Sequence, residues 1–452
     1  MQKSHSLRIA WCSPLTTKSC LRTSEYTKQA LSILSEKNNI ELFLSDEDLD
    51  ELSQDSFQGV SAYHYHWLTR AHAREAFDLF VYQIENHPRA NFVKNCLVQW
   101  PGLTFFHDTN LNRIYFDALK HSTGGTDFNK EMDTLFGTSS IRFGDWHVRG
   151  WPLEILDCFY IRGLEELKQA GAISVFSERM KDEVRHLLND QALISIAPSL
   201  FSISGDVLSK RNSSSEYTIG VSGVTTLEDR ALQILESFLF VKKQRLTFKV
   251  IWLVHDEFEK KKIEETLSLF EQNEEGVKEL ITVEFVHSIS SISKALESVD
   301  VFLSLSHSPR VGPSLSLQIA SKMDLPIIAS DTGPGLDVLS ESLFRVGLGS
   351  KERGILSELL CYFVSNNVRC ASEVKTLNQS NGDVLQSYLN EFAQSLSPLV
   401  AKKAQALLAA KDLVIKAIKE QTSSLDFQTI DSKYGIEMVE TVSEDFKWDT
   451  IA

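Results

Sequence analysis

The sequence predicts an α/β protein made of two successive doubly wound parallel sheets. Short apolar runs alternate with helical patterns along most of the 452 residues, as they do in βαβ units. A polar stretch at 202–217, SISGDVLSKRNSSSEY, interrupts this alternation and is typical of a linker. The chain is also too long for one ordinary hydrophobic core. We therefore expect a first domain at 1–201 and a second at 218–395, facing each other across a cleft.

Each half supplies its own series of buried strands. In the first half the expected strands are LRIAWC, IELFLS, DLFVYQI, LTFFHD, AISVFS and LISIAPS. Helical patterns such as TKQALSILSEK and RMKDEVRHLL fall between some of them. In the second half the expected strands are YTIGVSG, FKVIWLVH, ITVEFVHS, DVFLSLS, LPIIAS and LFRVG, again with helices between. Two parallel sheets follow from this order.

The remaining residues, 396–452, form a C-terminal extension. From Leu399 to Glu420 the pattern is that of an amphipathic helix. Its apolar face consists of Val400, Ala404, Leu407, Leu408, Val414, Ile415 and Ile418. We expect the Leu407, Leu408 and Ile415 face to be buried on the first domain or on another chain, because so wide a stripe is not left in water. Trp448, near the end, is expected to pack only partly.

Composition excludes several classes of protein. The net charge of −15 argues against general binding to nucleic acid, because phosphate neutralisation needs an excess of Lys and Arg. The six cysteines show no CxxC grouping, which favours reduced thiols and a cytoplasmic location. No signal peptide or transmembrane stretch is expected, so membrane contact would be peripheral.

Several of these segments, in this order, resemble one known family. LRIAWCSPL, LTFFHD, YTIGVSG and DVFLSLSHSP followed by LSLQIASKMDLPIIASDTG are similar to elements of the family 4 (group 1) glycosyltransferases. The resemblance covers most of the chain. It implies the GT-B fold, in which two Rossmann-like domains face each other across a sugar-nucleotide cleft. It also implies a donor held without a dedicated metal, by an Arg or Lys pair, a helix N-terminus and two glutamates about two turns apart.

The donor positions of that family are altered here. Val311 or Gly312 stands at the first glutamate position and Ile319 at the second, with Gln318 as the one nearby hydrogen-bonding substitute. Asp229 falls where a Lys is expected, beside Arg230. A charge of the right sign at 4 Å is worth ~4 kcal/mol at an effective dielectric near 20, so its reversal costs orders of magnitude in donor affinity. The first-domain glycine loop reads TTKSCLRTSEY, without glycine.

Two functions of different class follow. In the first, the chain is degenerate at the donor site, binds no cofactor and serves as a binding or assembly component with a protein partner or as a homo-oligomer. In the second, it is an active retaining glycosyltransferase that moves a sugar to a glycan, lipid or protein acceptor. The donor contacts would then be Gly223, Arg230, Arg310, Gly312, Ser314, Ser316, Gln318 and Asp331.

His107 and Asp108 are the vestigial catalytic candidates. His107 would either contact the transferred sugar or be a strand-end residue satisfied by a backbone carbonyl. Asp331 is expected to cap the loop after its strand or, alternatively, to face the cleft. The several departures at charge-bearing positions favour the degenerate reading.

Other motifs have a plainer interpretation. In AYHYHW, His64 and His66 would share one face of an extended segment, the spacing of two metal ligands, but no third ligand is identifiable and no metal is expected. FGDWHVRGW at 143–151 is an acceptor or partner contact or, equally, part of the core. STGGTDF at 122–128 lacks the strand-loop-helix context of a phosphate loop.

Overall fold

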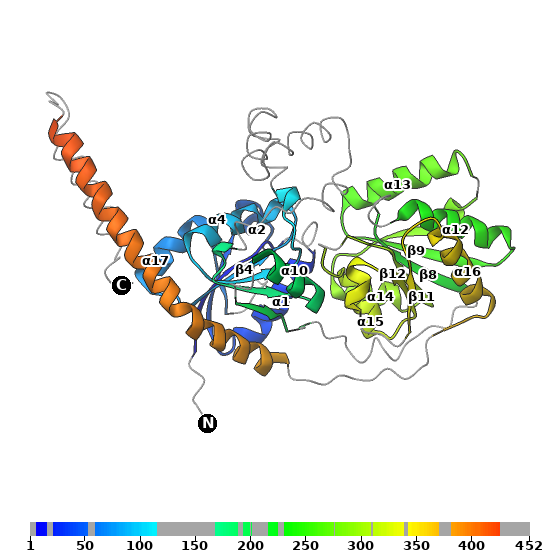
Figure 1. The fold of residues 1–452 in the computed structure, drawn as a ribbon, viewed down its shortest axis with the longest axis horizontal. Helices are drawn as coiled ribbons and strands as arrows, with labels where there is room; N and C mark the ends of the chain where they lie inside the picture. The colour runs from blue at the N-terminus through cyan, green and yellow to red at the C-terminus, as the bar shows by residue number, and fades with distance from the viewer. Residues whose placement is uncertain are drawn as a thin grey trace.

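A computed structural model describes residues 6–15, 21–52, 59–114, 168–188, 193–198, 200, 216–224, 230–274, 276–308, 311–338, 342–369 and 381–424. These residues form two parallel sheets, each with its own helices, placed side by side along the long axis of the molecule (Figure 1). The expected α/β fold with two Rossmann-like domains is confirmed. Each apolar run predicted as a strand contains one.

The first sheet has the strand order β3-β2-β1-β4-β5-β6-β7. Its strands are β1 Arg8–Cys12, β2 Asn39–Leu44, β3 Ser61–His64, β4 Leu79–Ile84, β5 Leu103–Phe106, β6 Ala172–Val175 and β7 Ile194–Ile196. Every residue of β4 and β5 is buried, because helices cover both faces of a parallel sheet. The helices are α1 Leu21–Leu34 on one face and α3 Leu68–Arg74, α4 Asn91–Gln99 and α10 Glu178–Leu188 on the other, with the short α2 Asp46–Glu51 after β2.

The second sheet has the strand order β10-β9-β8-β11-β12-β13. Its strands are β8 Tyr217–Ser222, β9 Phe248–Val254, β10 Ile281–Phe285, β11 Val301–Ser304, β12 Ile327–Ser330 and β13 Leu343–Val346. One face packs on α12 Ala231–Lys243, α13 Glu257–Glu271 and α16 Glu352–Ser365, and the other on α14 Ile289–Leu296 and α15 Leu315–Lys322. The strand order reverses between β8 and β11, where doubly wound sheets open a crevice at the carboxyl ends of their strands.

The C-terminal helix begins earlier than its sequence pattern indicated. α17 runs from Asn381 to Ser424, not from Leu399, and residues 381–395 lie in it. Its first turns bury Leu385, Leu389, Phe392 and Leu396 in the apolar cluster that contains β1 and α1 residues. These side chains recur every three or four residues, so the apolar face of the helix begins well before Leu399.

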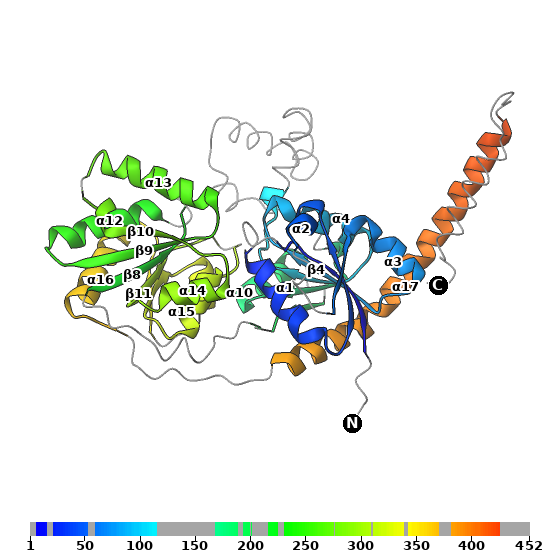
Figure 2. The same cartoon turned by 180° about the vertical axis from the view of Figure 1, so that it is seen from behind.

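The later turns of α17 meet the opposite face of the first sheet. Val400 and Ala404 are buried there, and Leu407 is partly buried. Helix burial on the first domain is seen at Val400 and Ala404, but of the predicted face Leu407 and Leu408 are only partly buried, and the side chain of Ile415 lies outside the described residues. Figures 1 and 2 show the last part of α17 leading away from the first domain.

Several sequence predictions fall outside the described residues: the linker at 202–215, both motifs at 122–128 and 143–151, and Trp448. None of the helices described is both long and apolar enough to span a membrane.

Candidate functional site

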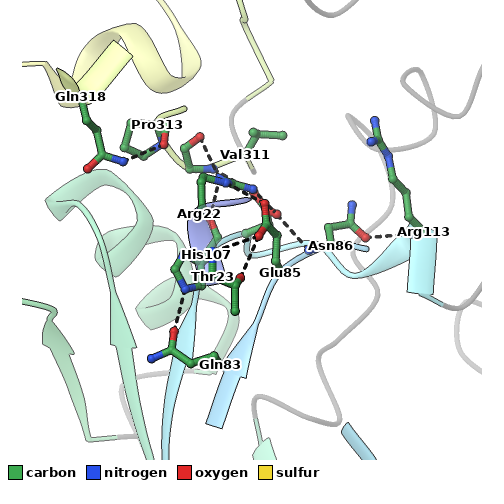
Figure 3. Close-up of polar contacts among 12 residues, drawn as sticks. Arg22, Thr23, Gln83, Glu85, Asn86, His107, Arg113, Val311, Pro313 and Gln318 are labelled. Atoms are coloured by element: carbon green, nitrogen blue, oxygen red, sulfur yellow. Dashed lines mark hydrogen bonds and ion pairs between the residues drawn. The ribbon is translucent and has the colours of Figure 1, made fainter. Parts of the chain in front are cut away.

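The two domains meet at the loop that precedes α15. Val311 forms an isolated antiparallel bridge with Asp108, which follows β5. The backbone nitrogen of Gly312 donates to Asp108 Oδ1 at 3.1 Å. A Cβ atom on Gly312 would lie only 2.3 Å from the carbonyl oxygen of His107. Only glycine therefore fits, and the backbones of the two domains touch at this point (Figure 3).

Arg22, in the first turn of α1, lies next to this contact and is surrounded by polar groups (Figure 3). Its Nε donates to Glu85 Oε1 at 2.9 Å and its Nη2 to Asp108 Oδ2 at 2.7 Å. Its Nη1 donates to the carbonyl oxygens of His107 and Gly312, each at 3.2 Å. Burial disfavours the charged guanidinium, but the carboxylates of Asp108 and Glu85 outweigh it and raise the pKa of Arg22. One buried positive charge thus lies between two buried negative charges.

Glu85 follows β4 and is fixed by the start of α1. The hydroxyl of Thr23 donates to its Oε2 at 2.7 Å. Burial alone would raise the pKa of Glu85, but Arg22 and the hydrogen bonds from Thr23 lower it. Glu85 is therefore ionised at neutral pH.

His107 is a buried, neutral residue. Burial, reinforced by the nearby charge of Arg22, lowers its pKa to about 3. Its Nε2 lies 2.7 Å from Gln83 Oε1, and its ring stacks on Phe176 with centroids 4.4 Å apart. The partner is thus a side-chain amide and not the backbone carbonyl that the sequence suggested. A histidine held in this way is uncharged at neutral pH.

A second charged contact joins the domains. Arg179, at the start of α10, pairs with Asp337, which lies in the short 3₁₀ helix Gly333–Asp337. Its Nη2 donates to Asp337 Oδ2 at 2.7 Å and to the carbonyl oxygen of Val311 at 2.9 Å, while its Nε donates to Asp337 Oδ1 at 3.1 Å. The paired contacts hold the planar guanidinium in one orientation.

The first residues of α15 are used for local structure. Ser314 caps the helix, accepting from the backbone nitrogen of Leu317 at 3.1 Å. Ser316 is fully buried, with its hydroxyl 3.4 Å from Nε2 of His255. Gln318 Nε2 donates to the carbonyl oxygen of Pro313 at 3.0 Å, and Ile319 is 0% exposed within the apolar cluster. The residue at the second glutamate position is therefore core.

Other expected donor contacts lie apart from this loop. Arg230, just before α12, donates from Nε to Glu352, which is 2% exposed, at 3.0 Å. Gly223 has a φ of 96°, and its carbonyl oxygen accepts from Trp252 Nε1 at 2.8 Å. Asp331 is exposed, and its backbone nitrogen donates to the carbonyl oxygen of Val346 at 3.0 Å. Asp229 and Arg310 lie outside the described residues.

The two histidines of AYHYHW do not share one face of a strand. β3 ends at His64, and His66 lies in a 3₁₀ turn, Tyr65–Trp67. His64 Nε2 contacts Asp46 Oδ1 at 3.1 Å, and its Nδ1 accepts from the backbone nitrogen of His66. In the portion of the chain described here, no group of three His, Cys, Asp or Glu side chains is arranged to hold a metal ion.

Sequence reasoning missed Glu85, Arg179, Asp337 and Glu352. The sequence does contain a pattern that points to Glu85. Glu85 comes directly after one predicted strand and Asp108 ends another. Because β4 and β5 are neighbours, their carboxylates meet at the same sheet edge. The pairs that Arg179 and Arg230 form join positions more than a hundred residues apart, for which the sequence offers no spacing rule.

No protein-family model and no curated protein matches the sequence. Solved structures do match in fold. Sucrose-phosphate synthase from Thermosynechococcus elongatus has a TM-score of 0.50 and 14% identity over 89% of this chain and 100% of that one. HepE from Anabaena, in complex with UDP-glucose, has a TM-score of 0.50 and 11% identity over 87% and 100%. WaaG, a glycosyltransferase involved in lipopolysaccharide biosynthesis, has a TM-score of 0.50 and 10% identity over 87% and 99%. The chain shares the GT-B fold of these enzymes.

Proposed function

We propose that this GT-B chain keeps the two-domain scaffold without the donor chemistry and acts as a binding or assembly component in the cytoplasm. One observation carries the proposal. The family resemblance places the transferred sugar between His107 and the first glutamate position, at Val311 or Gly312. Here Gly312 bonds directly to Asp108 at 3.1 Å, and its Cα has no room for even a methyl group against His107. This close backbone contact supports the proposal, because it lies between the two positions that would hold the sugar.

The charge at this point supports the same conclusion. A sugar-nucleotide donor brings a diphosphate, which requires positive charge that is free to approach it. Arg22 is already bonded to Glu85 and Asp108, and the guanidinium of Arg230 to Glu352. A diphosphate near Arg22 would also meet two carboxylates, each opposing it by ~4 kcal/mol at 4 Å and an effective dielectric near 20.

The hydroxyl groups of a donor would also lack hydrogen-bond acceptors. The family resemblance expects a glutamate at Ile319 to accept from the ribose, but Ile319 is buried in the core. Gln318 is committed to Pro313 at 3.0 Å. Each donor hydroxyl left without an acceptor costs about 1–3 kcal/mol.

The proposed binding role belongs to the C-terminal helix. The apolar face that packs Val400 and Ala404 on the first domain continues in the sequence to Val414 and Ile418. Both views show this part of α17 leading away from the first domain (Figures 1 and 2). We place the contact with another protein chain, a partner or a second copy, on this part of α17.

One observation favours the second candidate function, sugar transfer from a nucleotide donor. The buried hydroxyls of Ser222, Ser308 and Thr332 have no hydrogen-bond partner among the described residues. They follow or end β8, β11 and β12, whose carboxyl ends line the crevice in which doubly wound sheets bind ligands. Such groups suit a polar ligand, and the two functions predict opposite results in one assay.

The test is a turnover assay on the full chain with UDP-, GDP- and ADP-sugars. We expect neither hydrolysis nor transfer above a protein-free blank, with sucrose-phosphate synthase as the positive control for the method. Release of a nucleoside diphosphate that Asp108→Asn abolishes would establish the chain as an enzyme and overturn the proposal.

A further inference from the structure

The apolar core of this molecule continues across the boundary between its domains. One contiguous cluster of buried side chains contains Trp11, Leu15 and Tyr26 from the first domain together with Ile289 and Leu315 from the second. Domains joined by small polar interfaces move relative to each other by default, and a continuous apolar interface removes that freedom. The two domains therefore share one apolar cluster across their boundary.

Polar contacts close the same boundary at three places. The carboxylate of Glu25, in α1, accepts from the backbone nitrogen of Ile289 at the start of α14, at 3.3 Å. Arg22 and Asp108 hold the backbone of Gly312, as described above. On the α10 side, Arg179 binds Asp337 and the carbonyl oxygen of Val311. The contacts come from α1, the end of β5 and α10, so separating the domains would have to break all of them together.

Most of the groups in these contacts are withdrawn from solvent. The side chain of Arg22 is 15% exposed and that of Asp108 4%, while Arg179 and Asp337 are 17% and 3% exposed. Separating the domains would part the carboxylate of Asp337 from the Arg179 guanidinium that it binds, and would take the Gly312 backbone nitrogen away from Asp108. A buried charge that loses its partner is strongly unfavourable.

We propose that these contacts lock the two domains into one permanently closed body. Gly312 is the centre of the lock, because its lack of a side chain is what allows the backbones to touch. The inference rests on the interface alone and does not depend on the proposed loss of donor chemistry. It gives the chain a single rigid surface made of both domains.

Gly312→Ala is the most direct probe of the lock. The added methyl group would meet the carbonyl oxygen of His107 at 2.3 Å, and a backbone atom cannot move aside as a flexible side chain can. The loop must therefore withdraw from the first domain. Gly354→Ala is the matched control, because nothing lies within 4 Å of its added Cβ and it sits in the exposed first turn of α16.

The measurement is the distance between spin labels on the full chain, by double electron–electron resonance. Labels attached through non-canonical amino acids at the exposed positions Glu36 and Lys261 leave the cysteines untouched. We expect one narrow distance population for the unsubstituted chain and for Gly354→Ala. Gly312→Ala and Asp108→Ala should add a population shifted to longer distances.

Two results would overturn the lock. One is a broad or two-population distribution in the unsubstituted chain, which decides the matter even if the variants do not fold. The other is a folded Gly312→Ala protein with an unchanged distribution. Binding of a nucleotide sugar by a chain with one narrow population would instead contradict the proposed function and leave the lock standing.

Discussion

The side chain of Ile319 is fully buried at a position where the family resemblance expects a glutamate that faces a ribose. The helix around it is not distorted, and Ser314 caps it normally. Its inward face is completed by Leu315, which is also buried. An apolar residue here gains the free energy of burial, about 1.5–3 kcal/mol for a side chain of this size. In this structure the side chain of Ile319 is a packing residue of the core.

A carboxylate at this position should therefore unfold the second domain. For Ile319→Glu we expect a loss of several kcal/mol in the free energy of unfolding, because the buried charge would have no partner. Gln318→Glu, one residue away and partly exposed, loses one hydrogen bond and should cost only about 1 kcal/mol. Urea unfolding of both variants makes the comparison. Equal stabilities would mean that residue 319 faces the cleft after all.

His107 makes stability depend on pH. Its folded pKa of about 3 lies below the ordinary value of 6.5, so the unfolded chain takes up the proton first as the pH falls. The stabilising contribution is complete above pH 6.5 and is lost progressively toward pH 3. His107→Gln, which can still bond Gln83, should show a shallower decline than the unsubstituted chain in urea unfolding over this range. Parallel curves would show that His107 titrates normally in the folded protein.

Residues of the site were predictable only where the resemblance named them. Val311, Gly312 and Ile319 were identified from their place after β11 as departures from the glutamates that the resemblance implies. Their actual roles could not be inferred, because the bridge from Val311 to Asp108 joins residues that are distant in the chain. Sequence periodicity carries no information about such contacts between domains.

The strands and most helices were predictable because the spacing of apolar residues along the chain determines them. Each apolar run bounded by polar turns became a strand, since a parallel strand is buried on both faces. The start of α17 was predicted too far along the chain, because the prediction used only the local apolar pattern. Pro398 favours a helix start, whereas the helix here passes through Pro398 and begins at Asn381. The earlier turns are held by contacts that only the fold provides, such as the amide pair of Asn38 and Gln386.

The stability of α17 on the first domain can be tested with two leucines of one turn. Leu396 is 2% exposed and would lie 2.6 Å from a Cβ on Gly171, whereas Leu399 is 44% exposed. Leu396→Ala should cost about 2–5 kcal/mol of unfolding free energy. Leu399→Ala should change it by no more than ~0.5 kcal/mol. Equal losses in chemical unfolding would contradict the packing described.

At the scale of the whole molecule, the comparisons show the fold, and the loss of donor chemistry is our proposal. The chain shares its fold with sucrose-phosphate synthase, HepE and WaaG at 14%, 11% and 10% identity. A fold of this kind supports many functions, and activity has to be argued from the site. Here Arg22, Asp108 and Gly312 bind one another where the domains meet, and the proposal of lost donor chemistry is argued from these contacts.

Calorimetric titration of the full chain with UDP-, GDP- and ADP-sugars tests this account most directly, because it measures binding whether or not a reaction follows. We predict no heat beyond dilution at millimolar donor, since the Gly312 loop packs against the backbone of His107 and Arg22 is already paired with Asp108. Micromolar binding of any one of these donors would contradict the account.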